Sequence, residues 1–151
     1  MKREESLGYQ INHLARLLEQ ALRVRIAPMG VVPGQFAQLL ALYERDEVTQ
    51  NELREQVRID QSTMAHTLNR MQRDGLIVRR PDPTDGRKAL IALTAHAHSL
   101  EVDLVRAADD VNAAASQEIS DQEMAQYLEL TARLIANLEA HRTAPTGGSD
   151  G

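Results

Sequence analysis

The strongest constraint on the fold lies in residues 49–94, where two short helices are predicted to precede a strand-like hairpin directly. Thr49 and Glu52 have the spacing of a capping box, which opens the first helix. Asp60 is suited to cap the second helix, and Gly75 is suited to end it in a left-handed conformation. The predicted elements are helices over residues 51–56 and 61–74, then strands over residues 76–80 and 87–93 around the tight turn PDPTDG.

The second of these helices has one apolar edge and one polar face. Met64, Leu68 and Met71 share an edge at 100° per residue, which predicts that this edge is buried. The polar face and its flanks consist of Gln61, Ser62, Thr63, Ala65, His66, Asn69, Arg70 and Arg73. In the major groove of DNA, Asn and Gln pair with adenine, Arg pairs with guanine, and small residues approach the thymine methyl group. A solvated helix face fits the stripe equally well, so its neighbours must decide between the two interpretations.

The distribution of charge favours DNA as the partner of this region. Residues 54–90 carry eight Lys or Arg and five Asp or Glu, whereas residues 91–151 carry three and ten. The formal net charge of −5 argues against a protein that coats nucleic acid indiscriminately. The local basic excess permits contact with phosphate in the central block, while the acidic C-terminal third is expected to stay away from the DNA backbone.

The hairpin adds four basic residues, Arg79, Arg80, Arg87 and Lys88, and with the two helices joined by VRID it forms a winged helix-turn-helix. Alternation along a strand sends Arg79 and Arg80 to opposite faces, so only one is expected to reach phosphate, and we assign Arg79 to that role. Arg87, just past the Gly86 turn, is the best candidate for insertion into an adjacent minor groove.

The remainder of the chain is predicted to be helical. Leu7, Ile11, Leu14, Leu18 and Leu22 form one stripe of a helix that ends near Pro28, and Pro33 begins another. From Thr94 a helix of about 25 residues would span nearly 40 Å, longer than a domain of this size needs, so it is expected to project as a stalk. A last helix covers about residues 121–140. The fold class is therefore mainly α with a small β-hairpin wing.

The stretch VTQNELREQVRIDQSTMAHTLNRMQRDGLIVRRPDPTDGRKALIALT resembles the MarR family of bacterial transcription regulators. The resemblance is most specific in DPTDGR, where Asp82, Asp85 and Arg87 match the wing signature of the family. It implies that the carboxylate of Asp85 steadies Arg87. Turn chemistry alone accounts equally well for the two aspartates.

The resemblance extends over about residues 6–140 and implies a homodimer that binds a pseudo-palindromic operator as a repressor. Residues 1–30 and 94–142 would form the helical dimerisation region, and residues 31–93 the DNA-binding winged helix. Half-sites one helical turn apart need recognition helices roughly 34 Å apart, which a helical stalk can provide. The tail, residues 143–151, has the composition of a flexible linker.

Proteins resembling this family bind a small, often aromatic or anionic effector between the winged lobe and the stalk, and the bound effector releases DNA. His13 and Arg16 on the first helix are the candidate ligand-binding residues, with Arg16 suited to a carboxylate. For Arg16 an exposed position or an interfacial salt bridge is the favoured explanation. The alternative function is a winged helix that binds DNA constitutively, or binds protein, without a small-molecule input.

Several classes of function are excluded or disfavoured. The chain has no Cys, which removes disulfides, thiolate metal sites, a cysteine nucleophile and thiol-based peroxide sensing. No nucleophile motif, phosphate loop or HExxH motif is present, so no enzyme is predicted. His96 and His98 alone make a poor metal site, and no cofactor or metal is expected. The chain has neither a signal peptide nor an apolar run of membrane-spanning length, so a cytoplasmic location is expected.

Overall fold

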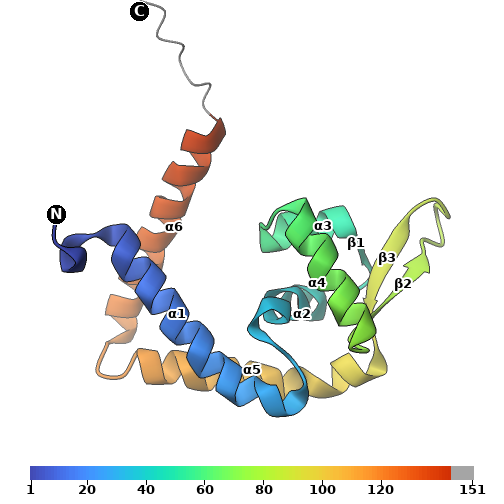
Figure 1. The fold of residues 1–151 in the computed structure, drawn as a ribbon, viewed down its shortest axis with the longest axis horizontal. Helices are drawn as coiled ribbons and strands as arrows, with labels where there is room; N and C mark the ends of the chain where they lie inside the picture. Colours follow the sequence, from blue (N-terminus) through green and yellow to red (C-terminus); the bar gives the residue numbers. More distant parts are fainter. Residues whose placement is uncertain (144–151) are drawn as a thin grey trace, which may run out of the picture. The chain divides into compact units, whose positions relative to one another are not determined.

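The computed structural model describes residues 1–143 and is mostly helical (Figure 1). The helices are α1 (Leu7–Ile26), α2 (Pro33–Glu44), α3 (Gln50–Val57), α4 (Gln61–Arg73), α5 (Ala95–Ala115) and α6 (Asp121–Thr143), with short 3-10 turns at Arg3–Glu5 and Ala27–Met29. The strands are β1 (Val48–Thr49), β2 (Ile77–Pro81) and β3 (Ala89–Leu93). The predicted fold class is confirmed. The predicted tail lies outside the described residues except for Thr143, which belongs to α6.

The chain divides into two compact units, residues 1–112 and the residues from 113 onward. The first unit holds the winged lobe together with α1 and most of α5, and the second holds α6. The sequence predicts a division by function, in which both ends of the chain form a dimerisation region. That division stays a prediction. Within the described residues no single helix could cross a membrane, and only the bent pair of residues 7–29 and 33–44 meets the length and composition criteria together.

The sheet corrects the sequence prediction in two ways. It has three antiparallel strands in the order β1-β3-β2, because Val48 pairs with Ile91 on the free edge of the hairpin. A strand of two residues is too short to show alternation, so its existence depends on the partner strand. The connection between β2 and β3 covers residues 82–88 in place of a tight turn, which puts Arg87 and Lys88 in the wing loop, outside the strand predicted for them.

In the core of the first unit, one edge of α4 packs against α2, α3 and the sheet. Met64, Leu68 and Met71 are completely buried, as predicted, and they join a cluster that includes Leu39 and Leu53. Removing these side chains from water contributes about 1.5–3 kcal/mol each, which makes this edge the main anchor of α4. The opposite face of the helix is thereby turned outward.

The two short helices begin at the caps that the sequence predicts. The Thr49 hydroxyl accepts from the Glu52 N–H (3.2 Å), and the Asp60 carboxylate accepts from the Thr63 N–H (2.8 Å). Gly75 has φ of 74°, the left-handed conformation expected for the residue that stops α4. The first of the two helices extends one residue further than expected at each end, to Gln50 and Val57.

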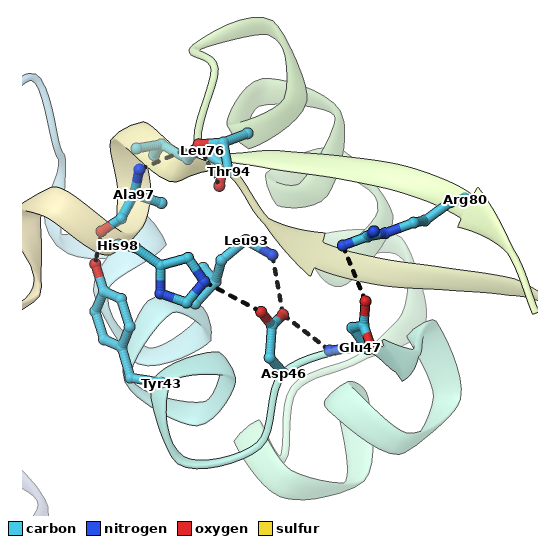
Figure 2. Close-up of polar contacts among 9 residues, drawn as sticks. All are labelled: Tyr43, Asp46, Glu47, Leu76, Arg80, Leu93, Thr94, Ala97 and His98. Atoms are coloured by element: carbon cyan, nitrogen blue, oxygen red, sulfur yellow. Dashed lines mark hydrogen bonds and ion pairs between the residues drawn. The ribbon is translucent and has the colours of Figure 1, made fainter.

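Asp46 connects the end of α2 to the sheet and to α5 (Figure 2). Its Oδ1 accepts from the backbone N–H groups of Glu47 (2.8 Å) and Leu93 (2.9 Å), while its Oδ2 lies 3.3 Å from His98 Nε2. One carboxylate therefore holds the last residue of β3 and the first turns of α5 in a fixed position.

The start of α5 is held by two further contacts. Thr94 caps the helix by accepting from the Ala97 N–H (3.1 Å), and its hydroxyl donates to the Gly75 carbonyl (2.6 Å). The Tyr43 hydroxyl donates to the Ala97 carbonyl, and burial followed by the negative charge of Glu101 raises the pKa of Tyr43 to about 12. The phenol consequently stays a donor throughout the physiological pH range.

The stalk helix is shorter than predicted. It has 21 residues and ends at Ala115, although the apolar pattern continues to Ile119. Glu118 takes φ of 62°, which interrupts the helix, and Ser120 caps α6 by accepting from the Glu123 N–H (3.1 Å). Periodicity alone could not reveal this break, because the local backbone conformation and the new cap end the helix.

Two helices leave apolar side chains exposed in the single chain. On α1, the exposed residues include Leu7 (55%), Ile11 and Leu14, all from the predicted stripe. On α6, Leu128 is 59% exposed and Leu138 is 65% exposed. Faces of this kind on soluble proteins mark contact surfaces.

Candidate nucleic-acid interface

The exposed face of α4 brings together the polar residues that the sequence singled out. Gln61, Ser62, His66, Asn69 and their neighbours Thr63, Arg70 and Arg73 are exposed, and Ala65 is half-buried. The burial of Met64, Leu68 and Met71 on the other edge determines which side faces outward.

The N-terminal turn of this face is organised around Asp60. The hydroxyls of Ser62 and Thr63 donate to the Asp60 carboxylate at 2.9 and 2.7 Å, in addition to the capping bond from the Thr63 N–H. These hydrogen bonds, led by the backbone bond from Thr63, lower the pKa of Asp60 to about 2. Since a carboxylate can only accept, both hydroxyl protons point inward and their lone pairs face an outside partner.

The C-terminal end of α4 is attached to α2 by a buried amide. Gln35 is 2% exposed, and its Nε2 donates to Asp74 Oδ2 (2.9 Å) while its Oε1 accepts from the Val32 N–H (3.3 Å). The bond from Gln35 is the main reason that the pKa of Asp74 lies below its usual value. Gln35 is absent from the residues predicted from sequence, because no local pattern distinguishes a buried glutamine from an exposed one.

Arg79 and Arg80 point to opposite faces of β2, as alternation predicts. Arg79 Nη2 donates to Asn69 Oδ1 (3.2 Å) and its Nη1 donates to Gln72 Oε1, both on α4. Arg80 instead forms an ion pair with Glu47 (2.9 Å; Figure 2). Gln72 is missing from the predicted set, although its position three residues after Asn69 places it on the same face of the helix.

The wing loop is shaped by its two aspartates in different ways. Asp82 Oδ1 accepts from the N–H and the hydroxyl of Thr84 (2.9 and 2.8 Å), which is turn chemistry, and these bonds hold the pKa of Asp82 below its usual value. Asp85 Oδ1 accepts from both the N–H (3.1 Å) and Nε (3.3 Å) of Arg87. The Arg87 side chain is 93% exposed, so Asp85 steadies a guanidinium that projects from the loop.

Comparison with known proteins shows which family this part of the chain resembles. A family model described as the MarR family matches residues 29–88, from the turn before α2 to the wing loop. Over these residues the chain is similar to the MarR family.

Individual proteins are similar to larger parts of the chain. The organic hydroperoxide resistance transcriptional regulator of Bacillus subtilis (strain 168) is 30% identical over 94 residues, which are 62% of this chain and 64% of that protein. The chain thus spans less than two thirds of that curated relative. A probable transcriptional regulator from Pseudomonas aeruginosa has 28% identity, covering 88% of this chain and 99% of the other, with a TM-score of 0.81. The PcaV regulator from Streptomyces coelicolor, crystallised with its natural ligand, has 27% identity over 90% and 96% of the two chains, with a TM-score of 0.74.

The first unit has a cavity of about 480 Å³ between α1, α2 and α5. It is lined by Leu18, Glu19, Leu22, Pro33, Gly34, Phe36, Leu40, Ala108, Val111 and Asn112. The predicted ligand residues His13 and Arg16 lie on α1 but do not line it. Glu19, one helical turn after Arg16, does line it and is paired with Arg23 (2.7 Å). Tertiary packing determines which residues line the cavity. Of these, the sequence pattern indicates only Leu18 and Leu22, which belong to the apolar stripe of α1.

Among residues 1–143 no group of three or more His, Asp or Glu side chains is arranged to hold a metal ion. The two histidines considered for that role have other positions. His98 lies against Asp46, at the contact that fixes β3 to α5, and His96 is exposed.

The depressed pKa of Asp60 predicts a pH dependence for folding. Because the folded pKa is about 2 and the unfolded value is near the ordinary 3.8, the stabilisation is complete above about pH 4 and is lost as the pH falls toward 2. Asp60→Asn keeps a capping oxygen but has no carboxylate to titrate. Urea unfolding of both proteins between pH 5 and pH 2.5 should show the advantage of the wild type shrinking with acidification. A constant difference over this range would contradict the assigned role.

Proposed function

We propose that this chain is a sequence-specific DNA-binding transcription regulator that acts as a homodimeric repressor, with α4 in the major groove and the wing loop at the adjacent minor groove. The observation that carries the proposal is the pairing of an outward polar face on α4 with an exposed arginine, Arg87, steadied by Asp85 on the neighbouring wing. The B. subtilis relative bears the name of a transcriptional regulator, which supports the same function.

The chemistry of the α4 face suits direct contact with base edges. A helix fits the major groove of B-form DNA, and the first turns of α4 carry Gln61, whose amide can pair with a base. Ser62, Thr63 and Ala65 in the same turns are small enough to allow close approach. The following turns carry His66, Asn69, Arg70 and Arg73, which supply donors to bases and phosphates. Lys88, in the loop beside Arg87, adds a backbone contact on the wing side.

Dimerisation follows from the apolar faces of α1 and α6. Each buried Leu contributes about 1.5–3 kcal/mol when it leaves water, so the exposed leucines of both helices favour association with a second copy. A closed two-fold dimer would present two α4 helices to a pseudo-palindromic site. In this arrangement residues 1–30 and 94–142 act as the dimerisation region and residues 31–93 as the DNA-binding lobe.

A small aromatic effector is proposed to bind in the cavity between α1, α2 and α5. Most of the lining is apolar, including Phe36 and Leu40, which suits an aromatic ring. Arg16 lies one helical turn before Glu19, so its side chain is a candidate to pair with a carboxylate that extends from the cavity. His13 lies one turn before Arg16, further from the cavity lining. With no cysteine in the chain, a response to hydroperoxide through a thiol is excluded.

Selection of bound sequences from random duplex DNA tests DNA binding. The wild type should recover an inverted repeat with half-sites about one helical turn apart. Arg87→Ala should weaken binding and reduce the slope of log K against log salt by about 0.9 for each phosphate that the variant no longer neutralises. Arg106→Ala, an exposed arginine of α5 paired with Asp103, serves as the control and should leave the slope unchanged. Absence of any enriched sequence at low salt would contradict the proposal.

Sedimentation equilibrium tests the dimer. Leu138→Glu puts a carboxylate on the apolar face of α6 and should raise the dimer dissociation constant by more than about tenfold, because an unpaired charge would have to be buried. Val78→Glu, at an exposed apolar position of β2, should leave it unchanged. A wild type that stays monomeric at micromolar concentration would be inconsistent with the proposed assembly.

Titration of the protein–DNA complex with aromatic carboxylates and their uncharged amides tests the effector. Ala108→Phe fills the cavity and should abolish release of DNA by both classes while leaving DNA affinity without ligand unchanged. Arg16→Ala should weaken release by carboxylates only. A wild type that no aromatic compound releases would favour a constitutive DNA-binding protein.

A further inference from the structure

We propose that Arg79 sets the base preference of Asn69, so that Asn69 selects guanine where an unrestrained asparagine would select adenine. This inference rests on the proposed function, since it concerns how α4 contacts bases. It makes Arg79 a positioning residue, in place of the phosphate contact that the sequence suggests for it.

The first step is the orientation of the Asn69 side chain. A guanidinium has only donors, so the amide group that faces it must present its oxygen. Arg79 Nη2 lies 3.2 Å from Asn69 Oδ1, and Nη1 of the same guanidinium donates to Gln72 Oε1. The two amides are three residues apart on α4, so a single arginine on β2 orients both of them. Their NH₂ groups are left to face other partners.

The second step concerns what such an amide can recognise. Asparagine selects adenine by accepting from N6 and donating to N7 at the same time. In this chain the Asn69 oxygen already accepts from a cation, and the positive charge beside it disfavours the approach of the adenine amino group. Guanine presents two acceptors, N7 and O6, in the major groove. The Asn69 NH₂ group and the nearby guanidinium both favour these acceptors.

The third step is that Arg79 makes different contacts from the other basic residues of the wing. Arg79 is half-buried and bonded to α4, whereas the Arg87 side chain is 93% exposed on the wing loop. Arg80, the next residue along β2, is paired with Glu47 in place of a residue of α4. Arg80 is therefore a matched control, with the same side chain on the same strand but on its other face.

The experiment compares base preferences of the wild type, Asn69→Ala, Arg79→Met and Arg80→Met by selection from random duplexes. The position that loses its preference in Asn69→Ala identifies the base pair contacted by Asn69. Wild type should prefer guanine there, and replacing it with adenine in the selected duplex should weaken binding about tenfold. Arg79→Met keeps the aliphatic stem, frees the Asn69 oxygen, and should shift the preference at this position toward adenine. Arg80→Met should leave it unchanged.

The possible outcomes are distinct. If Arg79→Met weakens binding equally on the guanine and adenine duplexes and reduces the salt slope, Arg79 contacts phosphate and the inference is overturned. Adenine at the Asn69 position in the wild type, or an Asn69→Ala protein with unchanged preference, would also overturn it while leaving the proposed DNA binding intact. A wild type that selects no sequence would overturn the proposed function as well. The melting temperature of each variant verifies that it is folded.

Discussion

Burial of one edge of α4 is the constraint on which the rest of the interface depends. Because Met64, Leu68 and Met71 are fully buried, the helix cannot rotate about its axis without exposing apolar surface, and its polar face is held outward. Side chains then hold the two ends of the helix. Asp60 caps the first turn, and Gln35 from α2 binds Asp74 just beyond the last. A helix held in rotation and at both ends presents its polar groups in one arrangement, as contact with specific bases requires.

Internal hydrogen bonds also reduce the range of partners that this face can accept. Ser62 and Thr63 direct their hydroxyl protons to Asp60, so the N-terminal turn presents acceptors. Asn69 and Gln72 direct their oxygens to Arg79, so the C-terminal turns present donors. The residue types alone permit both roles at each position. Intramolecular partners thereby convert ambiguous side chains into ones with a definite polarity.

Much of the fold could be predicted from sequence because the responsible signals are local. The Thr49–Glu52 box, the Asp60 cap and the left-handed Gly75 are each determined within a few residues, and the apolar edge of α4 follows from its helical period. Features that depend on pairing between distant segments were not predictable in this way. The strand β1 exists through its pairing with β3, and the cavity lining combines three helices. The contact from Arg79 to α4 also depends on how the hairpin folds back over the helix.

The position of α2 relates the cavity to α4. Pro33 and Gly34 line the cavity, and the next residue, Gln35, donates the hydrogen bond that holds Asp74 at the end of α4. At the other end of the same helix, the Tyr43 hydroxyl donates to the Ala97 carbonyl in the first turn of α5. Asp46, just after the helix, accepts from the Leu93 N–H of β3. A ligand that shifts the start of α2 would therefore act on a helix bonded to α4, α5 and the sheet. For such a ligand to release DNA, it must bind the shifted position more tightly than the original one, since only differential affinity moves an equilibrium between two states. The buried Gln35 amide carries such a shift to α4, because its hydrogen bond to Asp74 must either move with α2 or break.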